Sequence, residues 1–218
     1  QTIFGLEEVL ATELFRLGAK NVEQLNRAVS FSGDLGFLYK ANLCLRTALR
    51  ILLPIDTFEV SDENAFYNSI QAIDWEKYMD VNDTLAIDTV LNSDLFTHSQ
   101  YLSQKAKDAI VDKFREKYEI RPSVDLDKPT VKINLHIFND TCTVSLDSSG
   151  ESLHKRGYRD KTNLAPINEV LAAGLVLLSG WDKRTNFIDP MCGSGTIVIE
   201  AALLANNIPA GYFRENFG

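Results

Sequence analysis

The chain has 218 residues, of which 45% are hydrophobic, and carries a formal net charge of −8. This acidic balance excludes a surface coated throughout with nucleic-acid-binding charge, so any contact with nucleic acid has to be local. The sequence contains neither a signal peptide nor a long uncharged apolar run, which argues against a membrane span. Cys44, Cys142 and Cys192 lie far apart without zinc-ligand spacing. Such sparse cysteines favour a reducing cytoplasm and no metal site.

Two helices and two strands are expected within the first sixty residues. Apolar residues recur at helical spacing over residues 6–17, and Gly18 is a typical stop. Residues 22–31 are predicted to form one strand, and residues 35–45 a second helix. Apolar positions alternate strictly over residues 49–55, which predicts a strand with one buried face. This order fits a small ferredoxin-like unit that lacks its first strand.

A second unit is expected to follow, up to about residue 147. The pattern predicts a short helix at residues 65–73, a strand at residues 85–91 and a long helix at residues 99–118. Residues 131–146 alternate on both sides of an Asn–Asp pair, which is the pattern of a β-hairpin. The outer face of the long helix carries lysines, a pattern that usually marks a solvated surface.

The stretch after this unit, residues 148–163, is polar and contains two glycines, so it is expected to be a loop. Basic residues with an interleaved aromatic suit phosphate contact combined with base stacking. An equally open alternative is that these side chains pair with neighbouring acids and hold two domains together. The residues in question are Lys155, Arg156, Tyr158, Arg159 and Lys161.

Next, residues 167–178 form an amphipathic pattern that predicts a helix, with Pro166 in its first turn and Gly180 at its end. The sequence from residue 186 to residue 202 then predicts a buried strand, a glycine turn and another helix. Gly193 and Gly195 would supply positive φ angles and leave no Cβ in the way of a ligand. A helix that begins in this way directs unpaired N–H groups and its positive dipole end toward whatever lies over the turn.

Three cofactors compete for this turn. A dinucleotide turn needs a third glycine where Val198 stands, and a phosphate-binding P-loop needs a lysine that is absent. The octet Asp189–Thr196, with an acidic residue at the strand end and then a glycine pair, closely resembles motif I of S-adenosylmethionine (SAM) methyltransferases. A tight turn without any ligand stays open as the alternative.

Together with this octet, residues 150–159 and 165–173 resemble the THUMP-domain RNA methyltransferases, most closely those of the RlmL type. The resemblance implies an α+β N-terminal part, with ferredoxin-like and THUMP units, followed by the beginning of a Rossmann-like α/β SAM-methyltransferase domain. The expected divisions are a ferredoxin-like unit at 1–60, a THUMP RNA-binding domain at 61–147, a basic linker at 148–163 and a methyltransferase part at 164–218.

The family activity implied by this resemblance is transfer of a methyl group from SAM to the exocyclic N2 of a guanosine in large-subunit ribosomal RNA, in the cytoplasm. Structured RNA is then the expected partner, with no membrane and no metal. Two alternatives remain, an adenine-N6 nucleic-acid methylase and an RNA-binding module without activity. The family pattern implies that SAM is contacted by Leu164, Ala165, Pro166, Asp189, Pro190, Cys192, Gly193, Ser194, Gly195 and Thr196.

The family's catalytic motif, Asn/Asp-Pro-Pro-Tyr/Phe, does not occur in these residues, so no catalytic residue is assigned to this chain. The sequence is accordingly interpreted as a fragment of a longer protein. It is expected to be inactive and to bind SAM weakly or not at all.

Overall fold

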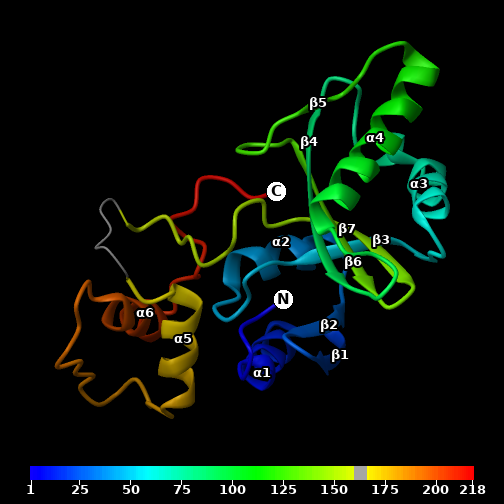
Figure 1. Cartoon of the computed structure of the whole chain (residues 1–218). Coiled ribbons are helices and arrows are strands. Elements are labelled where there is room, and N and C mark those ends of the chain that lie inside the picture. The colour runs from blue at the N-terminus through cyan, green and yellow to red at the C-terminus, as the bar shows by residue number, and fades with distance from the viewer. Residues whose placement is uncertain (160–165) are drawn as a thin grey trace. The chain divides into compact units, whose positions relative to one another are not determined.

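The computed structural model of the chain describes residues 1–159 and 166–218 (Figure 1). The chain divides into two compact units. The first unit comprises Gln1–Ile51 and Ser149–Phe217, and the second comprises Leu52–Ser148 with Gly218. The α+β class predicted from the sequence is confirmed.

The first unit begins with two helices on either side of a β-hairpin. These elements are α1 (Glu7–Leu17), β1 (Lys20–Leu25), β2 (Ala28–Ser32) and α2 (Leu35–Cys44). Helix α1 ends at Gly18, which adopts φ +100° as its position predicted. Helix α2 begins after Asp34, whose side chain accepts a hydrogen bond from the N–H of Phe37 at 2.7 Å.

The single strand predicted for residues 22–31 is wrong. Two antiparallel strands, β1 and β2, occupy this stretch and pair from Leu25 with Ala28 back to Lys20 with Ser32. The polar residues between them, which looked like an interruption of one strand, form a two-residue turn in which Arg27 has φ +56°. A change of chain direction needs such a turn, and period-two alternation alone does not reveal it.

The second unit is a five-stranded sheet in the order β3-β7-β6-β4-β5. Strand β4 is parallel to both β5 and β6, and the remaining pairs are antiparallel. Asn139 takes φ +53° in the β6–β7 turn, so the predicted hairpin is confirmed. The strands are β3 (Leu52–Glu59), β4 (Thr84–Asn92), β5 (Ser123–Val124), β6 (Val131–Phe138) and β7 (Thr141–Asp147).

Two α-helices and one short 3₁₀ helix accompany this sheet, namely α3 (Glu63–Ala72), η1 (Trp75–Lys77) and α4 (Ser99–Tyr118). Helices α3 and α4 pack together, and α4 contacts β4 (Figure 1). The bounds of α4 are those that the sequence predicted. A continuous core fills the space between sheet and helices and includes the fully buried Phe66, Trp75, Ile110, Leu135 and Ile137.

Two further helices of the first unit, α5 (Glu169–Leu178) and α6 (Thr196–Ala205), pack against each other. The expectation that Pro166 lies in the first turn of α5 is wrong. Asn168 caps this helix by accepting hydrogen bonds from the N–H groups of Val170 and Leu171, so Pro166 precedes the cap. Gly180 follows the helix with φ +69°.

The strand expected to end at Phe187 and Ile188 is also not found. Residues 186–189 pair with no other strand in the part of the chain that the structure describes, and Ile188 is 80% exposed. A β-strand is defined by hydrogen bonds to a neighbouring strand, so an apolar stretch without such a neighbour does not form one. None of the described helices has the length and apolar character that a bilayer span requires.

Candidate functional site: the glycine loop before α6

The loop from Asp189 to Gly195 turns the chain sharply into α6. Gly193 and Gly195 have φ +52° and +77°, as their place in the motif predicted. An Asp189 carboxylate oxygen accepts the N–H of Met191 at 3.0 Å, and the N–H of Gly195 donates to the carbonyl of Cys192 at 2.7 Å. The acidic residue and the two glycines therefore build the turn itself.

The outer side of this loop is open. A Cβ built on Gly193 would meet nothing within 4 Å, and Met191 is 90% exposed. Gly195 occupies the N-cap of α6, where no side chain from the described residues caps the helix. The first N–H groups of an α-helix have no partner within the helix, so this end can receive an acceptor or an anion. The residues present thus fit a polar ligand, and the loop is not filled by its own side chains.

The helix side of the loop is closed. Thr196, the first residue of α6, is 1% exposed. Its hydroxyl oxygen accepts a hydrogen bond from Nη2 of Arg159 at 2.5 Å and lies 3.2 Å from the hydroxyl of Ser194. Ser194 itself is exposed. The site therefore has one buried hydroxyl beneath it and one exposed hydroxyl on its surface.

Two residues of the linker, Arg156 and Tyr158, point inward. Arg156 is 2% exposed and donates to the carbonyls of Leu153 at 2.8 Å and of Arg46 at 2.5 Å. Its Nε lies 3.5 Å from a carboxylate oxygen of Glu200, and the hydroxyl of Tyr158 donates to the same oxygen at 3.0 Å. A buried guanidinium with these partners cannot also neutralise a phosphate.

Arg159 is similarly engaged within the first unit. Its Nε lies 3.1 Å from Glu169, and its Nη2 donates to the carbonyl of Ile167 as well as to Thr196. For Arg156, Tyr158 and Arg159 these contacts speak against a role in RNA contact, which stays a prediction. They favour the alternative in which the linker side chains pair with neighbouring acids, although the acids observed belong to the same unit. Lys155 differs, because its side chain is 57% exposed and pairs, among the residues that the structure describes, with Glu151, which is 63% exposed.

Three residues named from the sequence, Lys161, Leu164 and Ala165, lie outside the described residues. Pro166 is described but precedes the cap of α5. Of the ten residues expected to contact SAM, the structure brings together Asp189, Pro190, Cys192, Gly193, Ser194, Gly195 and Thr196 in the one loop.

The sequence reasoning missed the acids that bind these arginines. Glu200 is buried, and burial raises the pKa of its carboxyl, while Arg156, Tyr158 and Arg46 act in the opposite direction. One of its two oxygens has no hydrogen-bond partner among the described residues. Burial and the neighbouring Glu200 carboxylate also raise the pKa of Tyr158. A glutamate inside an otherwise apolar helix was the available signal.

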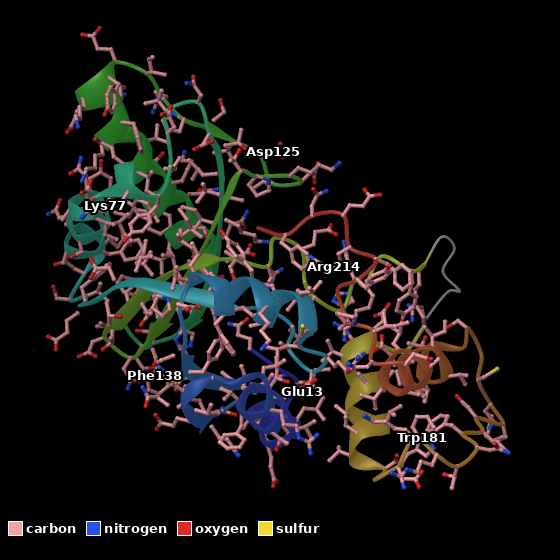
Figure 2. All side chains as sticks on the ribbon, turned by 180° about the vertical axis from the view of Figure 1, so that it is seen from behind. Glu13, Lys77, Asp125, Phe138, Trp181 and Arg214 are labelled. Atoms are coloured by element: carbon pink, nitrogen blue, oxygen red, sulfur yellow. The ribbon has the colours of Figure 1, made fainter. Side chains whose placement is uncertain are left out.

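A second missed acid, Glu13, lies on α1 and is labelled in Figure 2. It accepts hydrogen bonds from the N–H groups of Arg46 and Thr47 at 3.1 and 2.9 Å. The Arg46 guanidinium in turn donates to the carbonyl of Ile208, after α6. The elements around the glycine loop are thus connected to the N-terminal helices by buried polar contacts inside the first unit.

Arg214, also labelled in Figure 2, holds the beginning of the linker. Its two terminal nitrogens donate to four main-chain carbonyls at distances from 2.7 to 3.1 Å. These carbonyls belong to Ser149, Glu151, Ser152 and Lys155. Among the described residues, no group of three or more His, Cys, Asp and Glu side chains is arranged to hold a metal ion.

Comparison with known proteins decides the family. Residues 1–52 match the model of the RlmL ferredoxin-like domain, residues 60–147 that of the THUMP domain, and residues 156–218 that of the RMKL-like methyltransferase domain. The chain belongs to the RlmL type of THUMP-domain methyltransferases. The resemblance stated from the sequence motifs is therefore confirmed.

Individual relatives of this RlmL-type chain agree. It is 44% identical, over 98% of its length, to the ribosomal RNA large subunit methyltransferase K/L of Syntrophotalea carbinolica, and spans 31% of that relative. A protein from Listeria monocytogenes, described as a predicted N6-adenine-specific DNA methylase, matches 99% of the chain with 34% identity and a TM-score of 0.86. The structure of SMU.472 in complex with SAH matches with 32% identity and a TM-score of 0.85.

These solved structures extend further than the chain does. The RlmL-type chain covers 56% of the Listeria protein and 57% of SMU.472. The division into four stretches at residues 60, 147 and 163 stays a prediction.

Proposed function

We propose that the complete protein containing this chain methylates the exocyclic N2 of a guanosine in large-subunit ribosomal RNA, with SAM as methyl donor. The observation that carries this proposal is the open loop Asp189–Thr196 at the N-terminal end of α6, in a chain that also contains a THUMP domain. The complex of the related SMU.472 with SAH supports the choice of cofactor.

In this proposal the loop holds the amino-acid end of SAM. SAM supplies an electrophilic methyl group on a sulfonium. Gly193 and Gly195 let the backbone come close to the ligand, because they have no side chain. The first turn of α6 offers N–H groups to an anionic oxygen. On the buried side of the loop, the hydroxyl of Thr196 accepts a hydrogen bond from Arg159 and lies within hydrogen-bond distance of the Ser194 hydroxyl. The reaction then depends mainly on positioning of amine and methyl donor rather than on acid–base chemistry.

The proposed partner is structured RNA, recognised largely by its shape. A target base has to leave its stack before its amino group can be reached. In this proposal the THUMP domain holds the structured RNA while the base is presented to the catalytic domain. Of the linker residues, Lys155 remains a candidate for phosphate contact, since its amine is exposed. A role in ribosomal RNA processing places the protein in the cytoplasm in this proposal, with no part for a membrane or a metal.

The decisive experiment incubates the complete protein with methyl-labelled SAM and ribosomal RNA from cells that lack the modification. We expect label in N2-methylguanosine after digestion to nucleosides. Label only in N6-methyladenosine, or only in DNA, would discard the guanosine proposal. Absence of label with retained RNA binding would favour a binding module without activity.

A methylase acting on adenine N6 is the second candidate. The description of the Listeria relative, which is 34% identical to this chain, favours it. The THUMP match speaks for RNA as the substrate. The same digest separates the two candidates, because each methylated nucleoside has its own retention time and mass.

A further inference from the structure

Arg159 lies where the beginnings of two packed helices meet. Its guanidinium touches Glu169, the first residue of α5, and Thr196, the first residue of α6. A third contact goes to the carbonyl of Ile167 at 3.2 Å, just before the cap of α5. The side chains of Arg159 and Glu169 are only 17% and 6% exposed. One planar group thus bonds simultaneously to two acceptors at the beginning of α5 and to one, Thr196, at the end of the glycine loop.

A cation at this place is not explained by helix stability. Helix N-terminal ends carry positive dipole charge, so an arginine beside two of them is electrostatically unfavourable. The carboxylate of Glu169 offsets this repulsion. Arginine, unlike lysine, holds several acceptors in a rigid fork, which suits a role in fixing their relative positions.

The contact also favours one direction for the hydrogen bond between Thr196 and Ser194. Arg159 can only donate, so the oxygen of Thr196 accepts from it. The proton of Thr196 is then available for Ser194, whose oxygen lies 3.2 Å away. In the arrangement inferred here Ser194 is the acceptor in this pair, and its own proton is left to point outward from the exposed side of the loop.

We infer that Arg159 is a positioning residue that orders the glycine loop and, through Thr196, makes Ser194 present its O–H as a donor to an acceptor oxygen of the ligand. This inference rests on the proposed function for the identity of that ligand. There the acceptor is the carboxylate of the amino-acid end of SAM or SAH. The ordering of the loop itself does not depend on any ligand.

The first test therefore measures the loop without ligand. Amide hydrogen exchange is followed by mass spectrometry in the 218-residue chain and in Arg159→Met, Arg159→Lys and Lys155→Met. Loss of a charged hydrogen bond to Thr196 is expected to speed exchange in peptides covering residues 189–199 by about tenfold or more in Arg159→Met, with partial recovery in Arg159→Lys. Lys155→Met removes a charge from the same linker and should leave these peptides unchanged.

Peptides from α4, in the other unit, serve as the internal control. Equal protection of residues 189–199 in Arg159→Met and wild type would overturn the inference. Loss of protection throughout the whole first unit would also overturn it, because Arg159 would then support the fold rather than the loop.

The second test uses the complete protein and SAH binding by calorimetry. Thr196→Val keeps the shape of the side chain but has no hydroxyl to accept from Arg159 and donate to Ser194, so it should weaken SAH binding by about tenfold. Thr196→Ser keeps the hydroxyl and should bind SAH within about threefold of wild type. Ser194→Ala should add little to Thr196→Val, since both break the same chain. The KM for SAM should rise with that for RNA unchanged.

Full SAH affinity in Thr196→Val, or additive effects of the two changes, would overturn the relay. Absence of SAH binding by the wild-type protein would instead count against the proposed function. In that case the exchange measurement still decides whether Arg159 orders the loop.

Discussion

At the scale of single residues, the first unit depends on a few buried charges. The side chains of Arg156 and Glu200 are 1% and 0% exposed. A buried ion pair gains little over an apolar pair of similar volume, yet removing one member leaves the other without compensation. Arg156 also satisfies two main-chain carbonyls, of Leu153 and Arg46. Its value therefore lies in joining segments that are distant in sequence.

Replacing Arg156 by methionine should lower the free energy of unfolding of the first unit by roughly 3–5 kcal/mol, because a buried carboxylate and two carbonyls lose their partner. Urea-dependent hydrogen exchange of α6 peptides measures this change. Lys155→Met is the matched control, since its exposed ion pair should contribute less than about 1 kcal/mol. Similar effects of the two variants would contradict the assignment of Arg156 as a buried connector.

The carboxyl of Glu200 should make the stability of the first unit dependent on pH. Burial raises its pKa above the ordinary value of 4.5, so the folded chain binds this proton more tightly than the unfolded chain. The resulting stabilisation is complete below pH 4.5 and is lost as the pH rises through the raised pKa.

Glu200→Gln imitates the protonated carboxyl at every pH. Its stability relative to wild type is therefore expected to increase as the pH rises from about 4.5 to about 7.5. Exchange-derived opening free energies of α6, corrected for intrinsic rates, would reveal this trend. A difference between variant and wild type that is constant with pH would mean that the pKa of this carboxyl is the same in the folded and the unfolded chain.

At the scale of elements, the linker is held by tight packing of its backbone against residue 213 as well as by the ion pairs of its arginines. Gly157 has φ +87°, and a Cβ added to it would lie 2.2 Å from the carbonyl oxygen of Phe213. Gly180 also has a positive φ, +69°, but a Cβ added there would meet nothing within 4 Å. Comparing substitutions at these two glycines therefore distinguishes the cost of a left-handed backbone from the cost of a steric clash.

Gly180→Ala should cost about 1–2 kcal/mol from the left-handed backbone alone. Gly157→Ala introduces the same backbone strain and also a clash with main-chain atoms, which cannot move aside as a side chain can. The loss of stability in Gly157→Ala should therefore be clearly larger. Thermal unfolding and hydrogen exchange of residues 149–159 and 206–217 measure the comparison. Equal losses in the two variants would show that the linker moves aside without cost.

Much of the element pattern could be predicted from the sequence. Helix α4 and the β6–β7 hairpin follow directly from apolar periodicity, because each packs one face on the core of the second unit. The β1–β2 turn escaped because polar residues at a turn look the same as polar residues on an exposed strand. The unpaired segment at residues 186–189 escaped because strand pairing is a property of the neighbour as well as of the sequence.

The candidate site divides in the same way. The loop conformation at Gly193 and Gly195 was readable, since glycines with an acidic residue before them have a backbone reason to be there. The partners of Arg156 and Arg159 could not be predicted, because Glu200 and Glu169 are brought to them only by tertiary packing. A cluster of basic residues has the same sequence pattern whether its partner is a phosphate or a buried carboxylate.

At the scale of the whole molecule, the charge is unevenly distributed. Residues 52–148 carry twice as many Asp and Glu as Lys and Arg, whereas the rest of the chain is almost balanced. The lysines on the outer face of α4 also have partners. Lys105 pairs with Glu63 at 3.2 Å and Lys117 with Glu76 at 2.6 Å, while Lys113 donates to the carbonyl of Ile73. This face is therefore a poor candidate for neutralising phosphates.

We accordingly expect the double variant Lys105→Gln/Lys117→Gln to change the affinity for ribosomal RNA by less than about threefold. Each lysine would have to leave a carboxylate before it could reach a phosphate, and Glu63 and Glu76 would then repel the RNA. Filter binding over a range of salt concentrations measures both the affinity and its salt dependence. If α4 did bind RNA, each lost phosphate contact would reduce the slope of log K against log salt by about one. An unchanged slope would instead place the RNA-binding charge outside this helix.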